Sequence, residues 1–177
     1  MQRNRNEGTA PVRVALDAMG GDFAPEEMVK GAVQVIDSLN AELILVGDPE
    51  PVQQELSKYD VADKPITIFP SEGKIGDDEH PVQALRQKRK ASVVVATQLV
   101  KQGQADVIVS MGSTGAAMAS SVLALGLMDG LERPCLGGPF LGLAPNTVLV
   151  DIGSNLDCRP GLLLSFGVLG AAFARTY

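Results

Sequence analysis

The stretch that decides the fold runs from residue 107 to residue 125 and reads VIVSMGSTGAAMASSVLAL. It starts with β-branched residues, passes through a turn rich in glycine and hydroxyl groups, and continues as a run of alanine and leucine. This order predicts a strand, a loop and a helix. Residues 107–128 carry no charge and are numerous enough to span a bilayer. The polar centre of the stretch nevertheless favours the strand, loop and helix over a membrane span.

The same alternation of short apolar runs and helical segments recurs along the chain. We predict five strands, at residues 12–16, 43–46, 66–69, 107–110 and 147–151. Most of them are continuous apolar runs, as expected for strands that are covered on both faces. The pattern predicts the α/β class, with a mainly parallel sheet and helices on both of its faces. In such sheets, ligands bind in the loops at the carboxyl ends of the strands.

The composition excludes several classes of function. The chain has 177 residues, of which 45% are hydrophobic, so it is long enough and apolar enough to bury a core. A net charge of −6 and an aromatic content of 4% argue against nucleic-acid binding, both through phosphate contacts and through base stacking. His80 is the only histidine, which excludes metal sites that need several histidines. Our expectation is that the chain holds no metal and no cofactor, although two aspartates discussed below keep a metal-ligand interpretation.

The N-terminal residues and the cysteines indicate the compartment. Residues 1–11 are polar and lack the apolar segment of a signal peptide, so we expect a flexible tail on a cytoplasmic protein. Residues 12–177 are expected to form the folded part. Cys135 and Cys158 are the only cysteines, and we expect them to be small buried side chains and not a disulfide framework.

Three of the predicted loops follow strands and share glycine, hydroxyl and carboxylate residues. They read DAMGGD at 17–22, SMGSTGA at 110–116 and DIGSNLD at 151–157. We expect all three at one edge of the sheet, where glycine would let the backbone approach a ligand. The predicted binding residues are Asp17, Gly20, Gly21, Asp22, Ser110, Gly112, Ser113, Thr114, Gly115, Asp151 and Gly153.

The second loop is the clearest candidate for an anion site. Residues 112–115 open a helix directly after a strand, so free N–H groups would face a ligand and the helix dipole would favour an anion. Ser113 and Thr114 add hydroxyl donors. The alternative is a tight turn with a Ser or Thr cap. The loop has neither the P-loop pattern nor the glycine pattern of dinucleotide-binding folds.

The charged candidates have more than one interpretation. Asp17 and Asp151 end strands and could be general acids, metal ligands or helix caps. The basic cluster at residues 86–90 is either a solvated helix face or a group of phosphate ligands. His80 is either an acid or base, or a surface histidine.

Five sequence words resemble those of the PlsX-type phosphate acyltransferases, in the same order and at the same spacing. They read LDAMGGDFAP at 16–25, PVQALR at 81–86, SMGSTGA at 110–116, ERP at 132–134 and DIGSNLDC at 151–158. The resemblance implies an α/β/α sandwich similar to isocitrate dehydrogenases and phosphotransacetylases. The sequence departs from the family in three places: Asn is usual where Ser113 stands, Ala where Ser154 stands, and a Ser pair at residues 91–92.

The resemblance also implies a reaction. Members of the family transfer a long-chain acyl group from acyl carrier protein to inorganic phosphate, and the acyl phosphate is used for phosphatidic acid synthesis. They are cytoplasmic homodimers with a loose membrane association. On this basis we expect catalytic roles for Arg86 and Lys88, which would balance charge, and for Asn155, which would shape the cleft.

Members of the family continue for about as many residues again. The resemblance therefore implies that residues 12–177 form the N-terminal half of a phosphate acyltransferase fold. One alternative is a half-fold that binds only phosphate, or that is active only with a partner chain. The other alternative is acyl transfer from coenzyme A, as in phosphotransacetylases.

Overall fold

The computed structural model describes residues 10–139, 146–153 and 155–176. It divides into two compact units, Met1–Leu125 and Gly126–Tyr177. The first unit carries the parallel sheet and the first two of the three glycine loops. The second unit carries the third loop.

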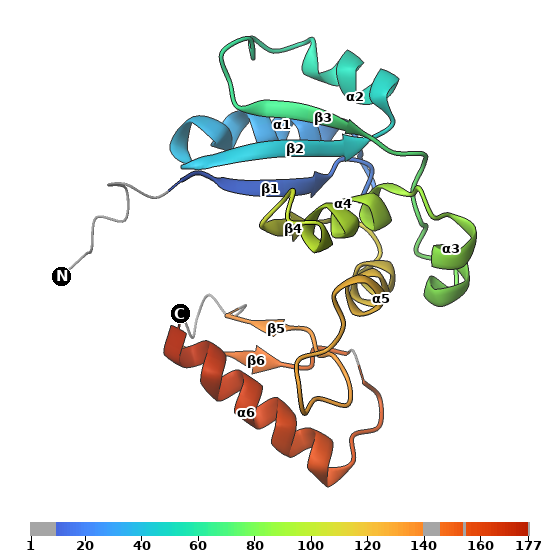
Figure 1. Ribbon diagram of the computed structural model, residues 1–177, viewed down its shortest axis with the longest axis vertical. Coiled ribbons are helices and arrows are strands. Elements are labelled where there is room, and N and C mark those ends of the chain that lie inside the picture. Colours follow the sequence, from blue (N-terminus) through green and yellow to red (C-terminus); the bar gives the residue numbers. More distant parts are fainter. Residues whose placement is uncertain (1–9, 140–145, 154, 177) are drawn as a thin grey trace, which may run out of the picture. The chain divides into compact units, whose positions relative to one another are not determined.

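The first unit is built on four parallel strands, which are labelled in Figure 1. They are β1 (Val12–Asp17), β2 (Ala41–Gly47), β3 (Ile66–Pro70) and β4 (Val107–Val109), in the spatial order β3-β2-β1-β4. Leu16 of β1 is paired with Leu45 of β2 on one side and with Val109 of β4 on the other. The mainly parallel sheet predicted from the apolar runs is confirmed.

Helices cover both faces of this sheet. On one face, α1 (Glu26–Val35), the 3₁₀ turn η1 (Ile36–Ser38) and α2 (Pro49–Leu56) pack against Leu43 and Leu45. On the other face, α4 (Ser92–Lys101) packs against Ala15 and Val46. Leu45 and Val46 are neighbours in β2 and point to opposite faces, as the alternation along a strand requires. Both are fully buried, which explains why the strand reads as a continuous apolar run.

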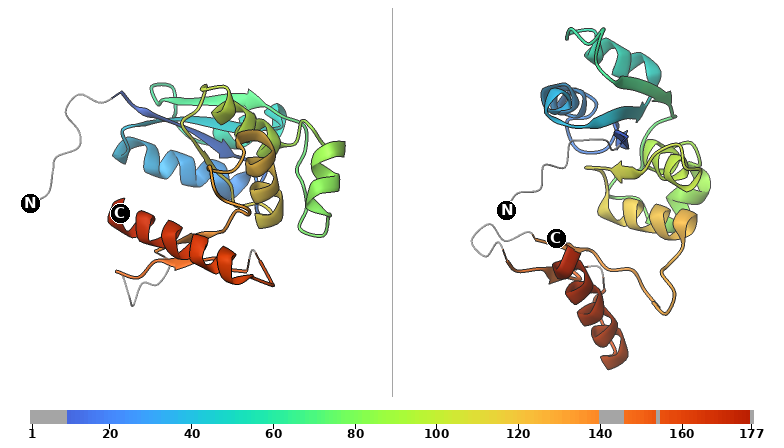
Figure 2. Two further views of the ribbon diagram at one scale, coloured as in Figure 1. Left: turned by 60° about the horizontal axis from the view of Figure 1, so that its bottom comes forward. Right: turned by 60° about the vertical axis from the view of Figure 1, so that its left-hand side comes forward.

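A third apolar cluster fixes the start of the helix that follows β4. It joins α3 (Pro81–Gln87) and α4 to α5 (Thr114–Leu125), and it includes the buried Ile75 from the loop before α3. Ala116, in the first turn of α5, is 1% exposed in this cluster. Along α5 the packing continues as a buried hydrogen bond of 3.0 Å from Ser120 Oγ to Thr97 Oγ1 on α4. Figure 2 shows α5 alongside α4.

The second unit is a two-stranded hairpin with one long helix. Strands β5 (Gly137–Gly138) and β6 (Leu149–Val150) pair in the antiparallel direction and precede α6 (Pro160–Thr176). The prediction that residues 147–151 join the parallel sheet is therefore wrong. The third glycine loop follows β6 and therefore does not leave the parallel sheet at all. Among the described residues, no helix is both long enough and apolar enough to cross a membrane.

Candidate functional site

The first two glycine loops meet at the carboxyl ends of β1 and β4. Ser110 Oγ donates a hydrogen bond of 2.7 Å to Asp17 Oδ2, and the Gly112 N–H donates one of 3.1 Å to Ser110 Oγ. The Met19 N–H donates to the other carboxylate oxygen of Asp17 at 3.2 Å. Asp17 is 2% exposed, so its carboxylate is turned inward and holds the two loops together. This part of the predicted convergence is confirmed.

Glycine at residues 20 and 112 allows the two loops to touch. A Cβ atom on Gly20 would lie 2.7 Å from the Gly112 nitrogen and 2.7 Å from Asp17 Oδ2. A Cβ on Gly112 would lie 3.2 Å from the Gly20 Cα. Gly21 has a φ of +93°, in the left-handed region that favours glycine. The sequence suggested that these glycines allow close approach to a ligand; here they first allow close approach of one loop to the other.

The second loop ends in the N-terminus of α5. Ser113 Oγ accepts a hydrogen bond of 3.4 Å from the Ala116 N–H, as a helix-capping serine does. Within the described part of the chain, the N–H groups of Thr114 and Gly115 have no acceptor. A Cβ on Gly115 would lie 2.8 Å from Cγ of Pro81, so this glycine permits contact with the start of α3. The turn is therefore capped by Ser113 and still presents two free N–H donors.

Lys88, one of the predicted catalytic residues, forms an ion pair with a carboxylate. Its Nζ donates to Glu79 Oε1 at 2.6 Å and to the backbone oxygen of Lys74 at 3.2 Å. The Gly76 N–H and the Lys88 ammonium, in that order, lower the pKa of Glu79. Arg86 is exposed in the last turn of α3, and no hydrogen bond joins it to the glycine loops among the described residues.

Lys74 is a cation that the sequence analysis did not single out. Its Nζ donates a hydrogen bond of 3.1 Å to the backbone oxygen of Gly21, in the first glycine loop. The two residues are 53 positions apart, and Lys74 lies in a polar loop without periodicity. No sequence pattern could therefore have connected them. Asp22, a predicted binding residue at the end of the same glycine loop, is exposed.

The third loop forms a separate polar cluster in the second unit. Asn155 Nδ2 donates to Asp151 Oδ1 at 2.9 Å and to the Pro134 oxygen at 3.2 Å. Asp151 has a φ of +63°, which is uncommon for a residue other than glycine. Its N–H donates to the Leu136 oxygen at 2.7 Å, and its side chain accepts the bond from Asn155. Gly153 has a φ of +75° and is exposed. Asn155 therefore links the Asp151 side chain to the backbone of the preceding segment.

The two cysteines lie close to the Asp151 carboxylate. Partial burial and then the charge of Asp151 raise the pKa of the Cys135 thiol, and the same two causes lead for Cys158. Cys158 Sγ also donates to Asp151 Oδ2 at 3.7 Å. Both thiols are therefore held in the protonated form, which is a poor nucleophile.

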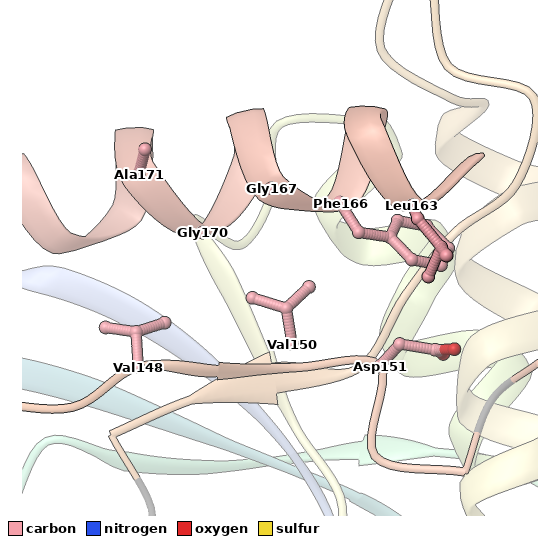
Figure 3. Close-up of a pocket in the computed structure, with 8 residues that line it drawn as sticks. All are labelled: Val148, Val150, Asp151, Leu163, Phe166, Gly167, Gly170 and Ala171. Carbon is pink, nitrogen blue, oxygen red and sulfur yellow. The ribbon is translucent and has the colours of Figure 1, made fainter. Parts of the chain in front are cut away.

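A cavity of about 510 Å³ lies between β6 and α6 (Figure 3). Its lining is apolar apart from Asp151, whose carboxylate lies at one end of the view. No pattern in the sequence indicates this cavity, because it depends on where α6 lies against β6. Among the described residues, no group of three or more potential metal ligands is clustered.

Known proteins are similar to this chain along nearly its whole length. The model of a family described as "Fatty acid synthesis protein" matches residues 12–177. Relatives named phosphate acyltransferase include a protein of Acaryochloris marina, 46% identical over 169 residues, which cover 94% of this chain and 49% of the relative. A relative from Nostoc punctiforme is 47% identical over 171 residues, covering 95% of this chain and 50% of its own length. One from Desulforamulus reducens is 47% identical over 163 residues, covering 92% and 49%.

The chain thus spans about half the length of the curated relatives that it matches. The matched residues include both glycine loops of the first unit and the Asp151 cluster of the second. The chain belongs to the fatty acid synthesis protein family, the family of the PlsX-type phosphate acyltransferases.

Proposed function

We propose that this chain binds inorganic phosphate at the N-terminus of α5, as the acyl acceptor of a phosphate acyltransferase. The observation that carries the proposal is the Ser110–Asp17 hydrogen bond of 2.7 Å, which fixes the two glycine loops beside the free N–H groups of Thr114 and Gly115. A helix N-terminus of this kind attracts anions through its N–H groups and its dipole. The name of the relatives, phosphate acyltransferase, supports phosphate as that anion.

The proposed reaction moves a long-chain acyl group from the thioester of acyl carrier protein to phosphate. A phosphate oxygen attacks the thioester carbonyl carbon, a C–O bond forms, and the C–S bond breaks. The sulfur leaves as a thiolate, which then takes up a proton. The product is an acyl phosphate, for use in phosphatidic acid and phospholipid synthesis.

Phosphate and thioester need little activation by side chains. Phosphate is already a dianion near neutral pH, and a thiolate is a fair leaving group. The protein has to hold the anion in line with the carbonyl carbon and to stabilise the oxyanion that forms. This agrees with a site built from backbone N–H groups and hydroxyls, such as Thr114, and with thiols that are kept protonated.

The other predicted residues have supporting roles in this proposal. Arg86 would add positive charge from the exposed end of α3. Asn155 would shape the third glycine loop through its hydrogen bond to Asp151. Asp22 and Gly153, which are exposed in the first and third glycine loops, would each contact substrate. Lys88 would act indirectly, because its hydrogen bonds to the Lys74 oxygen and to Glu79 hold the loop before α3 in place.

Partners and location form part of the same proposal. We infer a cytoplasmic protein that works with acyl carrier protein, pairs as a homodimer in the complete family fold, and associates peripherally with membranes. The resemblance to the family supports these assignments. A second candidate function is a half-fold that binds phosphate but needs a partner chain for transfer. For the 177 residues taken by themselves, the half-length match to the relatives makes this candidate the one to test against transfer.

One experiment separates the two candidates. Acyl phosphate formation is measured with the purified 177-residue chain, acyl carrier protein charged with a long-chain acyl group, and phosphate. The assay is repeated after adding the C-terminal half of a complete relative. We expect little or no product from the chain alone and substantial product from the mixture. Full activity from the chain alone, as a monomer, would show that acyl transfer needs no residues beyond these 177 and would exclude the half-fold.

A further inference from the structure

We propose that Lys74 is a further phosphate-binding residue, placed over the glycine loops by Lys88 and Glu79. This inference rests on the proposed phosphate site at the start of α5. It adds to that site the cation that the backbone N–H groups alone do not supply.

The loop that carries Lys74 lies against the first turn of α5. Ile75, the next residue, is 5% exposed in the apolar cluster that contains Ala116. At the other end of the loop, Pro81 is so close to Gly115 that a Cβ there would lie 2.8 Å from the proline Cγ. One end of this segment therefore shares an apolar cluster with Ala116, and the other end lies against Gly115, one of the two residues with a free N–H group.

The backbone of the loop is held by charge-assisted hydrogen bonds. Glu79 Oε1 accepts from the Gly76 N–H at 2.7 Å and from Lys88 Nζ at 2.6 Å. Lys88 Nζ donates in addition to the Lys74 backbone oxygen at 3.2 Å. The Gly73 N–H donates to Asp48 Oδ1 at 2.7 Å, on the turn after β2. Residues on both sides of Lys74 are thus fixed, and Lys88 bonds directly to its main chain.

The ammonium group of Lys74 lies where the two glycine loops meet. Its Nζ is 3.1 Å from the Gly21 oxygen, and a Cβ on Gly21 would lie 3.3 Å from the oxygen of Met111, the residue before Gly112. An ammonium group has three donors, and the bond to Gly21 uses one of them. Among the described residues the other two have no acceptor, and they are available to an anion bound at the N-terminus of α5.

Charge distinguishes Lys74 from its basic neighbours. Lys88 is paired with Glu79 and Lys90 with Glu72, each at 2.6 Å. Among the described residues, Lys74 forms no ion pair, and its bond goes to a neutral carbonyl. The Asp17 carboxylate, buried beside the same loops, adds negative charge that a bound phosphate would meet. An unpaired cation at this point offsets that repulsion.

The test is a phosphate titration of the purified chain at constant ionic strength, followed through the backbone amide signals of Thr114 and Gly115. We expect Lys74→Met to weaken phosphate binding about tenfold, the loss of one charge-assisted hydrogen bond. Lys74→Arg should restore most of the affinity. The matched control is Lys101→Met, which removes the same charge from the exposed last turn of α4 and should leave phosphate binding unchanged.

A double variant tests the role given to Lys88. Lys88→Met should weaken binding in the natural chain but cost nothing further in the Lys74→Met background, since it acts through Lys74. Equal losses from Lys74→Met and Lys101→Met, or no loss from Lys74→Met, would overturn the inference. If the unmodified chain does not bind phosphate, the proposed function itself is wrong. If it binds phosphate and Lys74→Met does not change the affinity, only the role of Lys74 is wrong.

Discussion

Ser110 Oγ donates a hydrogen bond of 2.7 Å to Asp17 Oδ2 across 93 positions of sequence. The bond joins the residue that ends β1 to the residue that follows β4, and the carboxylate that receives it is buried. A buried carboxylate is costly unless its oxygens are satisfied. The stability of the first unit and the geometry of the glycine loops therefore depend on the same bond.

Ser110→Ala should destabilise the chain by about 1.5–3 kcal/mol, because Asp17 loses a hydrogen bond to a buried charge. It should also weaken phosphate binding, since Gly112 loses its contact with Ser110. The measurement is urea unfolding together with phosphate titration. Ser121→Ala is the matched control: Ser121 is half-buried on α5, and within the described part of the chain its hydroxyl bonds only to the Ala117 oxygen of its own helix. Its removal should change stability by less than about 0.5 kcal/mol. Similar losses at the two serines would contradict the role assigned to Ser110.

The contact between the glycine loops predicts opposite effects for two Gly→Ala changes. Gly20→Ala should destabilise the chain by about 1–3 kcal/mol, because the new Cβ would lie 2.7 Å from both the Gly112 nitrogen and Asp17 Oδ2. Gly31→Ala lies within α1, where a Cβ meets nothing within 4 Å, and should stabilise by about 0.5–1 kcal/mol. Thermal unfolding of both variants checks the prediction. A stabilised Gly20→Ala chain would show that the loops do not pack as described.

Much of the fold could be predicted from the sequence, because the parallel strands are buried on both faces and read as apolar runs. Because the strands are parallel, the loops that follow them leave at a common edge, and Asp17 and Ser110 do meet there. The hairpin of the second unit could not be predicted. Its first strand is the pair Gly137–Gly138, which has no side chains to give a pattern. A Cβ on Gly137 would lie 2.6 Å from the Leu149 oxygen, so glycine is required for that pairing.

The site was predictable only in part. Glycine and hydroxyl residues after a strand indicate a loop near a ligand, but they do not tell whether a glycine faces the ligand or another loop. At Gly20 and Gly115 the close neighbours are Gly112, Asp17 and Pro81. The contact of Lys74 with Gly21 was also invisible, because it joins two loops that share no periodicity.

The ion pair between Arg13 and Asp106 predicts how stability changes in acid. Hydrogen bonds from the Arg13 side chain and backbone lower the pKa of Asp106 to about 2, from a usual 3.8. Because the folded-state pKa lies below the unfolded one, ionised Asp106 stabilises the fold above about pH 4, and this contribution is lost as the pH falls towards 2. Asp106→Asn should therefore be less stable than the natural chain at neutral pH, and the difference should shrink between pH 4 and pH 2. Urea unfolding across this range checks it, and a difference that does not depend on pH would contradict it.

The contact between Gly115 and Pro81 predicts an energetic coupling between the start of α5 and the start of α3. Gly115→Ala should destabilise the chain by about 1–3 kcal/mol, since its Cβ would lie 2.8 Å from the Pro81 Cγ. In a Pro81→Ala background that Cγ is absent, and the nearest remaining atom of residue 81 is the Cβ at 3.7 Å, an ordinary contact. Gly115→Ala should then cost little. The coupling free energy from the double-mutant cycle should be at least about 1 kcal/mol, measured by urea unfolding of the four chains. Additive effects would mean that α3 does not press on Gly115. If the effects were additive and both chains with Gly115→Ala also lost phosphate binding, glycine would be required at residue 115 for contact with the anion and not for contact with Pro81.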